Sequence, residues 1–245
     1  NLGEEVAEKR WARCHTCSLC EQGYHGIVLC ALGWACWKTY VGRPEKEGTL
    51  INAMRALGNG LSEAGHHEDT LSVEEAQFSM LQRMGVPELV LLDVQGNLAV
   101  TYARIGRLED SLRMSRDIYF GWLKLKGEEH GETIMAAHNY AASLASLKRY
   151  GEAKSLLRQT IFVAQRKGHD VTLKMRTIYA KALHDDDSAT LEELRESVEI
   201  LEDTERTTRR MLGNTHPMTK GIELALQKSR AVLRARETPP TKGEP

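Results

Sequence analysis

The fold is decided by the stretch Gly106-Arg107-Leu108-Glu109-Asp110-Ser111-Leu112, which follows Gly65-His66-His67-Glu68-Asp69-Thr70-Leu71 at an offset of 41 residues. A looser copy, Tyr150-Gly151-Glu152-Ala153-Lys154, comes about one period later. Glycines that close long amphipathic stretches keep nearly the same spacing: Gly85, Gly127, Gly168 and Gly213. A fixed period in this range is typical of helical repeat proteins, in which each unit packs only against its neighbours.

Each period contains two helical patterns. Apolar residues recur at three- and four-residue spacing over 90–105 and again over 108–126, which predicts one buried helix face in each stretch. The next period predicts helices over 132–147 and 150–167. Small residues also recur at matching positions, where we expect two helices to approach closely: Gly58, Ala99, Ala141 and Ala180.

The last period departs from this pattern. A helix over 171–184 is followed by a longer polar connection and then by an unusually long helix over 189–212. Thr190 and Glu193 have the spacing of a capping box at the start of that helix. The connection holds Asp185-Asp186-Asp187, which lacks the alternating spacing of a calcium loop, so we expect a solvated loop.

Three parts follow from these patterns. Residues 1–45 are rich in cysteine and tryptophan, and within them 27–40 could form a helix that covers the first repeat, or a zinc ion could order the segment. Residues 46–237 hold about four repeats and a final helix over 218–236, which should cap the stack because a terminal repeat must shield its open apolar face. Residues 238–245 are expected to be a disordered tail.

Composition excludes several classes of function. The net charge is −1, so we expect no nucleic-acid partner. The longest apolar run, 27–37, is too short to cross a bilayer, so we expect no membrane insertion. Nothing near Asn1 resembles a signal peptide, which favours a cytoplasmic location, and the missing initiator Met suggests a fragment or a trimmed form. We find no catalytic residues and no nucleophile or phosphate-loop motif, so we expect no enzyme.

One cluster could carry metal chemistry. Cys14, Cys17 and Cys20 are spaced by two residues each, as in a knuckle that wraps tetrahedral zinc, and His25 is the candidate fourth ligand. Cys30 is a second candidate for that position. The alternative is plain free or buried thiols, because no second pair of cysteines with this spacing follows. We therefore expect no cofactor unless zinc binds here.

Four stretches carry a family resemblance: Asn97-Leu98-Ala99, Gly106-Arg107-Leu108-Glu109-Asp110-Ser111, Gly127-Glu128-Glu129-His130-Gly131-Glu132-Thr133 and Leu212-Gly213-Asn214-Thr215-His216-Pro217-Met218-Thr219. They resemble, in order and spacing, the motifs of the tetratricopeptide repeats (TPRs) of kinesin light chain, over residues 50–236. The chain looks closest to the light-chain-like repeat proteins that are abundant in some marine microalgae. The resemblance implies an all-α fold, a right-handed α-solenoid of stacked TPR hairpins with a C-terminal capping helix.

The resemblance also implies a binding surface. In this family the first helix of each pair lines a concave groove, and an Asn there bonds to the backbone of an extended peptide. Asn97 and Asn139 match that position, and the competing interpretation is that they bond across repeats and hold helices together. Other residues expected to face the groove are Arg104, His138, Lys174 and Lys181, together with Asp93 and Ser146.

Two hypotheses follow. The first is a non-catalytic scaffold that binds a protein or peptide ligand in the concave groove. The second is a zinc-binding regulatory protein, in which the N-terminal cysteines hold the metal and the repeats support them.

Overall fold

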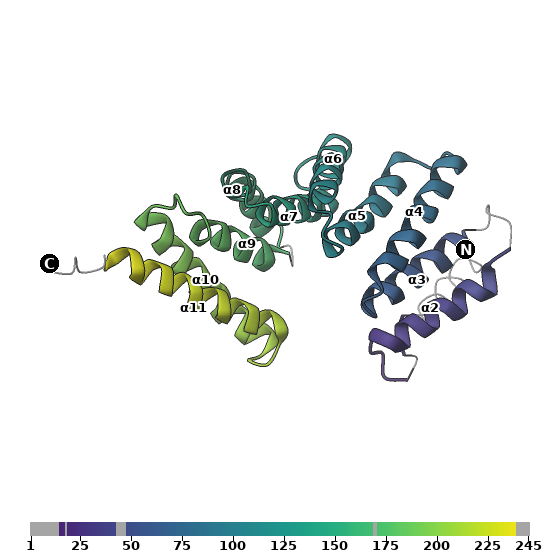
Figure 1. Ribbon diagram of the computed structural model, residues 1–245, viewed down its shortest axis with the longest axis horizontal. Coiled ribbons are helices and arrows are strands. Elements are labelled where there is room, and N and C mark those ends of the chain that lie inside the picture. The colour runs from purple at the N-terminus through teal and green to yellow at the C-terminus, as the bar shows by residue number, and fades with distance from the viewer. Residues whose placement is uncertain (1–14, 18, 43–47, 169–170, 239–245) are drawn as a thin grey trace, which may run out of the picture. The chain divides into compact units, whose positions relative to one another are not determined.

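The computed structural model describes residues 15–17, 19–42, 48–168 and 171–238, and the described chain is helical (Figure 1). It contains the helices α2 (Gly26–Tyr40), α3 (Thr49–Glu63), α4 (His67–Met84), α5 (Glu88–Arg104), α6 (Leu108–Lys126), α7 (Gly131–Ser146), α8 (Tyr150–Arg166), α9 (Thr172–His184), α10 (Leu191–Leu212) and α11 (Pro217–Glu237). The described residues form no strand beyond an isolated bridge between Thr16 and Gly23. The all-α prediction is confirmed.

The chain divides into two compact units, residues 1–114 and 115–245. Within each unit, helices that are consecutive in sequence lie side by side. No described helix combines the length and the apolar character needed to cross a bilayer. The tail predicted over 238–245 lies outside the described residues except for Thr238.

Unit 1 is built on a close contact between α2 and α3. The predicted helix over 27–40 forms, and it packs along α3 through two glycines. A Cβ atom on Gly33 would lie 2.7 Å from the carbonyl oxygen of Ala56, and one on Gly60 would lie 2.7 Å from the Cα atom of Cys30. The two backbones therefore touch, and neither position has room for a side chain.

Gly58 is different from these two glycines. It is buried as expected, but a Cβ atom there would lie 3.7 Å from Glu74 Cγ, an ordinary van der Waals distance. The close approach predicted at Gly58 is thus made at Gly33 and Gly60 instead. The other predicted small residues are buried: Ala99, Ala141 and Ala180.

Unit 2 has a continuous apolar core. Its main cluster joins α7, α8 and α9 through Ile134, Leu157 and Met175, none of which has exposed surface. A second cluster places Ile222 of α11 against Leu201 of α10. The last helix packs on both α9 and α10, as the predicted capping helix should.

The repeated glycines end helices or turns with positive φ angles. Their φ angles are 64° at Gly85, 78° at Gly127, 65° at Gly168 and 85° at Gly213. The shorter turn between the two helices of a pair uses Gly65 and Gly106 in the same way, but Lys148 takes this position in the next repeat, at φ 58°. A residue with a side chain adopts this conformation at a cost of roughly 1–2 kcal/mol, so the repeat geometry overrides local preference there.

Side chains cap three helix starts in unit 2, and one of these caps was predicted. Thr190 and Glu193 form the complete capping box at the start of α10. His130 Nδ1 accepts a hydrogen bond from the Glu132 amide at 3.3 Å, and His216 Nδ1 accepts one from the Met218 amide at 3.2 Å. These two histidines therefore cap helices.

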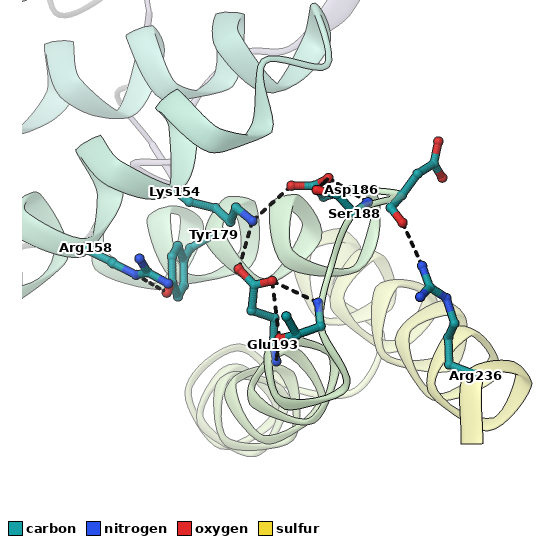
Figure 2. A network of polar contacts seen from close by, with 9 residues as sticks. Lys154, Arg158, Tyr179, Asp186, Ser188, Glu193 and Arg236 are labelled. Atoms are coloured by element: carbon teal, nitrogen blue, oxygen red, sulfur yellow. Dashed lines mark hydrogen bonds and ion pairs between the residues drawn. The ribbon is translucent and has the colours of Figure 1, made fainter.

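The acidic loop before α10 is held by ion pairs (Figure 2). Lys154 Nζ donates to Asp186 Oδ2 at 2.9 Å and to Glu193 Oε1 at 2.8 Å. Hydrogen bonds from Ser188, followed by the contact with Lys154, lower the pKa of Asp186 to about 2. The loop stays partly solvated, as expected, since Asp187 and Ser188 are exposed. The sequence did not predict that Asp186 pairs with Lys154, which is 32 residues earlier in the chain.

The same loop also contacts α11. Arg236 donates to the carbonyl oxygen of Asp187 at 2.6 Å, and Lys228 pairs with Asp185. Nearby, Arg158 Nε donates to the Tyr179 hydroxyl group at 2.8 Å (Figure 2). These contacts replace the short glycine turn used in the earlier repeats.

The α2–α3 contact leads to a prediction for Gly60. Gly60→Ala should lower the unfolding free energy by about 1–3 kcal/mol, because the new methyl group would push two backbones apart. Gly58→Ala is the matched control on the same helix, and it should be neutral or stabilising by up to about 1 kcal/mol, since alanine favours helix. Urea unfolding followed by circular dichroism measures both. Equal effects of the two substitutions would contradict the close contact.

Candidate functional site

Unit 2 carries a cavity of about 240 Å³ on the first helices of successive pairs, and we call it the lysine cavity. Its lining comes from α7, α9 and α11. The residues are His138, Lys174, Thr177, Ile178, Lys181, Met218, Gly221 and Ile222. Three of these eight were predicted to face the binding groove: His138, Lys174 and Lys181.

The lysine cavity combines apolar and cationic surface. Ile178 and Ile222 supply apolar side chains, while Lys174 and Lys181 are exposed. Neither lysine forms an ion pair with any residue in the described parts of the chain. Burial lowers the pKa of His138, so this histidine is neutral at pH 7. The cavity thus offers two uncompensated positive charges beside an apolar wall.

Asn139 lies next to this cavity. Its side chain is half-buried, and His138 Nδ1 lies 3.0 Å from Asn139 Oδ1. The contact joins neighbours on one helix, so it is not the bond across repeats that the competing interpretation requires. The role of Asn139 in binding a peptide stays a prediction.

Unit 1 carries a larger cavity of about 350 Å³, which we call the glutamate cavity. It lies between the start of α2 and the helices α3, α4 and α5. Its lining is Tyr24, His25, Leu29, Asn59, Ser62, Glu63, Glu74, Asn97, Val100, Thr101 and Arg104. Asn97 and Arg104 both line this cavity, and Asn97 is exposed, while their role in a peptide groove stays a prediction.

Sequence reasoning missed Glu74, the most unusual residue of the glutamate cavity. It is only 6% exposed, hydrogen bonds with Thr101, and leaves Oε2 without a partner among the described residues. Burial raises its pKa to about 7, although Thr101 and Arg104 act in the opposite direction. The sequence signal was its place three residues from Leu71 on the apolar face of α4, where a carboxylate is not expected.

Two other residues expected to face the groove have local partners. Asp93 Oδ2 accepts a hydrogen bond from Arg55 at 3.3 Å. Ser146 Oγ donates to the carbonyl oxygen of Ala142 at 3.0 Å. Both are exposed, and neither lines a cavity described above.

The candidate metal ligands are only partly brought together. Cys17 and Cys20 are in contact within one short turn, where hydrogen bonds from the Leu19 and Cys20 amides lower the pKa of Cys17 to about 7. His25 instead lines the glutamate cavity, and Cys14 lies outside the described residues. The described residues contain no group of three side chains that could hold a metal ion.

Comparisons agree with the repeat architecture. Residues 90–165 match the tetratricopeptide repeat family. The nearly identical TPR-like repeats of a kinesin light chain-like protein from Podosopora anserina share 17% identity, with a TM-score of 0.63 over 76% of this chain and 88% of that one. BtubC (BKLC) from P. vanneervenii shares 13% identity, with a TM-score of 0.59 over 87% of this chain and 91% of that one.

The apo form of RapI is also similar, at 12% identity and a TM-score of 0.55 over 95% of this chain and 89% of that one. No curated protein sequence matches the chain. The fold is therefore that of a TPR-like helical repeat protein, with the TPR itself recognised over 90–165. The resemblance to the repeats of kinesin light chain is confirmed at this level.

The raised pKa of Glu74 predicts a pH-dependent stability. Glu74 binds its proton more tightly in the folded state, where its pKa is about 7, than in the unfolded state, near 4.5. The contribution of Glu74 protonation to the unfolding free energy is thus fully present below pH 4.5 and is lost as the pH rises through 7. Glu74→Gln should remove this loss, so the variant should gain roughly 2–4 kcal/mol relative to wild type between pH 4.5 and 8.

Urea unfolding at several pH values measures this difference. Glu68→Gln, an exposed carboxyl-to-amide change on the same helix, is the control and should show little pH-dependent difference. A Glu74→Gln curve parallel to the wild-type curve would contradict the burial of an unpaired carboxyl group.

Proposed function

We propose that the protein is a non-catalytic scaffold that binds a peptide segment of a partner along the first helices of its repeats. The coarse part of this statement, a protein interaction scaffold, agrees with the TPR match and with the TPR-like neighbours. One observation supports the finer part: five of the eight residues expected to face the groove line a cavity in one unit or the other.

The lysine cavity suggests the chemistry of one ligand segment. An apolar side chain of the peptide would pack over Ile178 and Ile222, and an adjacent carboxylate would face Lys174 and Lys181. Lysine binds carboxylate as a point charge, and such contacts strengthen in partly desolvated sites. Asn139, beside the cavity, would bond to the peptide backbone.

Selection of random 12-residue peptides displayed on phage, with the immobilised full chain as bait, tests this proposal. Binders should be enriched in an apolar residue next to Asp or Glu. The affinity of a selected peptide should fall about tenfold or more in Lys181→Met, because one charge-assisted contact is lost. Lys124→Met, an exposed change in the same unit but outside the cavity, is the matched control and should leave the affinity unchanged.

Asn139→Ala separates binding from packing. If Asn139 serves the ligand, the melting temperature should hardly change, while the affinity falls by roughly 1–3 kcal/mol. If Asn139→Ala lost much stability while its intrinsic affinity stayed unaltered, the binding role of Asn139 would be contradicted. Selection without any enriched sequence, or binders indifferent to both substitutions, would contradict the peptide site.

The second candidate function is metal binding by the N-terminal turn. The turn that holds Cys17 and Cys20 supports it, because backbone amides directed at a thiol favour the thiolate form that binds zinc. Elemental analysis of protein purified without added metal tests this candidate. A zinc stoichiometry near zero would contradict metal binding by this turn.

A further inference from the structure

The carboxyl group of Glu74 lacks a partner that its burial demands. Nearly all buried polar atoms in folded proteins have a hydrogen-bond partner, and a buried carboxylate is costly without one. Glu74 is 6% exposed, and its Oε2 atom has no hydrogen-bond partner among the described residues. Because Glu74 lines a cavity of about 350 Å³, a ligand group could supply the missing partner.

The walls around Glu74 are suited to a long side chain. Gly58 lies beside the Glu74 stem, since a Cβ atom there would be in van der Waals contact with it, 3.7 Å from Glu74 Cγ. Leu29 and Val100 line the same cavity with apolar surface. A ligand side chain could thus bury methylene groups against these two residues before it reaches the carboxyl group.

The polar lining favours a positively charged donor. Two carboxyl groups, Glu63 and Glu74, face one guanidinium group, Arg104. Arg104 already donates to Ser62 Oγ. The amide groups of Asn59 and Asn97 add further acceptors at exposed positions of the lining.

We propose that the glutamate cavity binds a lysine side chain of a peptide partner, with its ammonium group paired to Glu74 and its methylene stem against Leu29 and Val100. Lysine fits because it joins a flexible four-carbon stem to a compact group with three donors and no acceptor. This inference deepens the proposed function, and it rests on it, because it assumes that the repeats bind peptides.

Binding should depend on pH. Glu74 holds its proton up to about pH 7, so an ammonium group that pairs with the carboxylate must displace that proton. Affinity should therefore be about tenfold higher at pH 8 than at pH 6, following the ionised fraction of Glu74. The other charged or titratable groups that face Glu74 in the cavity are Tyr24, His25, Glu63 and Arg104.

The probe is Nα-acetyl-lysine methylamide, titrated to millimolar concentration into the ¹⁵N-labelled full chain. The backbone amide signals of Gly58, Thr101 and Arg104 should shift saturably. Nα-acetyl-norleucine methylamide has the stem without the ammonium group and should bind at least tenfold more weakly. Alanine methylamide has a free amino group without the stem, and equal binding of this compound would overturn the lysine assignment in favour of an amino terminus.

Variants locate the charge that is responsible. Glu74→Gln should abolish both the preference for lysine over norleucine and the pH dependence. His25→Gln should keep the pH dependence, and Glu68→Gln, on the exposed side of α4, should behave as wild type. If the affinity of Glu74→Gln for the lysine compound still depended on pH, the inference would be overturned. Equal binding of the lysine and norleucine compounds by wild type would do so as well, and this arm requires no variant to fold.

The outcome is separable from that of the proposed function. If a phage-selected acidic peptide binds through Lys181 while the lysine compound does not bind, the inference about Glu74 is contradicted and the proposed function is not. If the lysine compound binds but no peptide is ever selected, the Glu74 site stands as a site for lysine-like amines and the peptide scaffold is contradicted.

Discussion

Within each unit the described helices bury their apolar faces against neighbouring helices, and the other features of the structure follow from this constraint. In unit 2 the side chains of Ile134, Leu157 and Met175 are fully buried between consecutive helices. In unit 1 the same demand brings α2 so close to α3 that Gly33 and Gly60 must lack side chains. A repeat stack tolerates such variation because each contact is local.

The same architecture explains where function can lie. In unit 2 the first helices α7, α9 and α11 lie beside one another, so residues from successive pairs meet around the lysine cavity. The two cavities differ in charge. The lysine cavity presents two positive charges that no described residue neutralises, whereas the glutamate cavity contains a buried carboxyl group. A partner that uses both would need acidic and basic groups in separate segments.

Periodic features were predictable from the sequence, and long-range contacts were not. Helix limits could be predicted to within a few residues, because apolar spacing and the left-handed glycines at 85, 127 and 168 determine them locally. The partner of Asp186 could not be predicted, since Lys154 belongs to an earlier helix and no spacing rule joins them. Glu74 was missed for a related reason: its burial depends on other helices, among them α5, whose Thr101 hydrogen bonds with it.

The candidate site was predicted only in part. The resemblance predicted that Asn97, Arg104, His138, Lys174 and Lys181 face a groove, and each of the five lines one of the two cavities. It could not identify the apolar wall of the lysine cavity, where Met218 and Ile222 come from the capping helix and follow no repeat motif. Likewise, the resemblance could not show that the close helix contact lies at Gly60 and not at Gly58. Only the backbone of α2, which approaches Gly60, distinguishes the two positions.

The central claim is that partners bind on the first helices of the repeats. Hydrogen exchange of the full chain, measured with and without a saturating selected peptide, tests it most directly. The account predicts that added protection in unit 2 concentrates in α7, α9 and the start of α11, whose residues line the lysine cavity. Protection confined to α8 and α10, with none on the cavity helices, would contradict it.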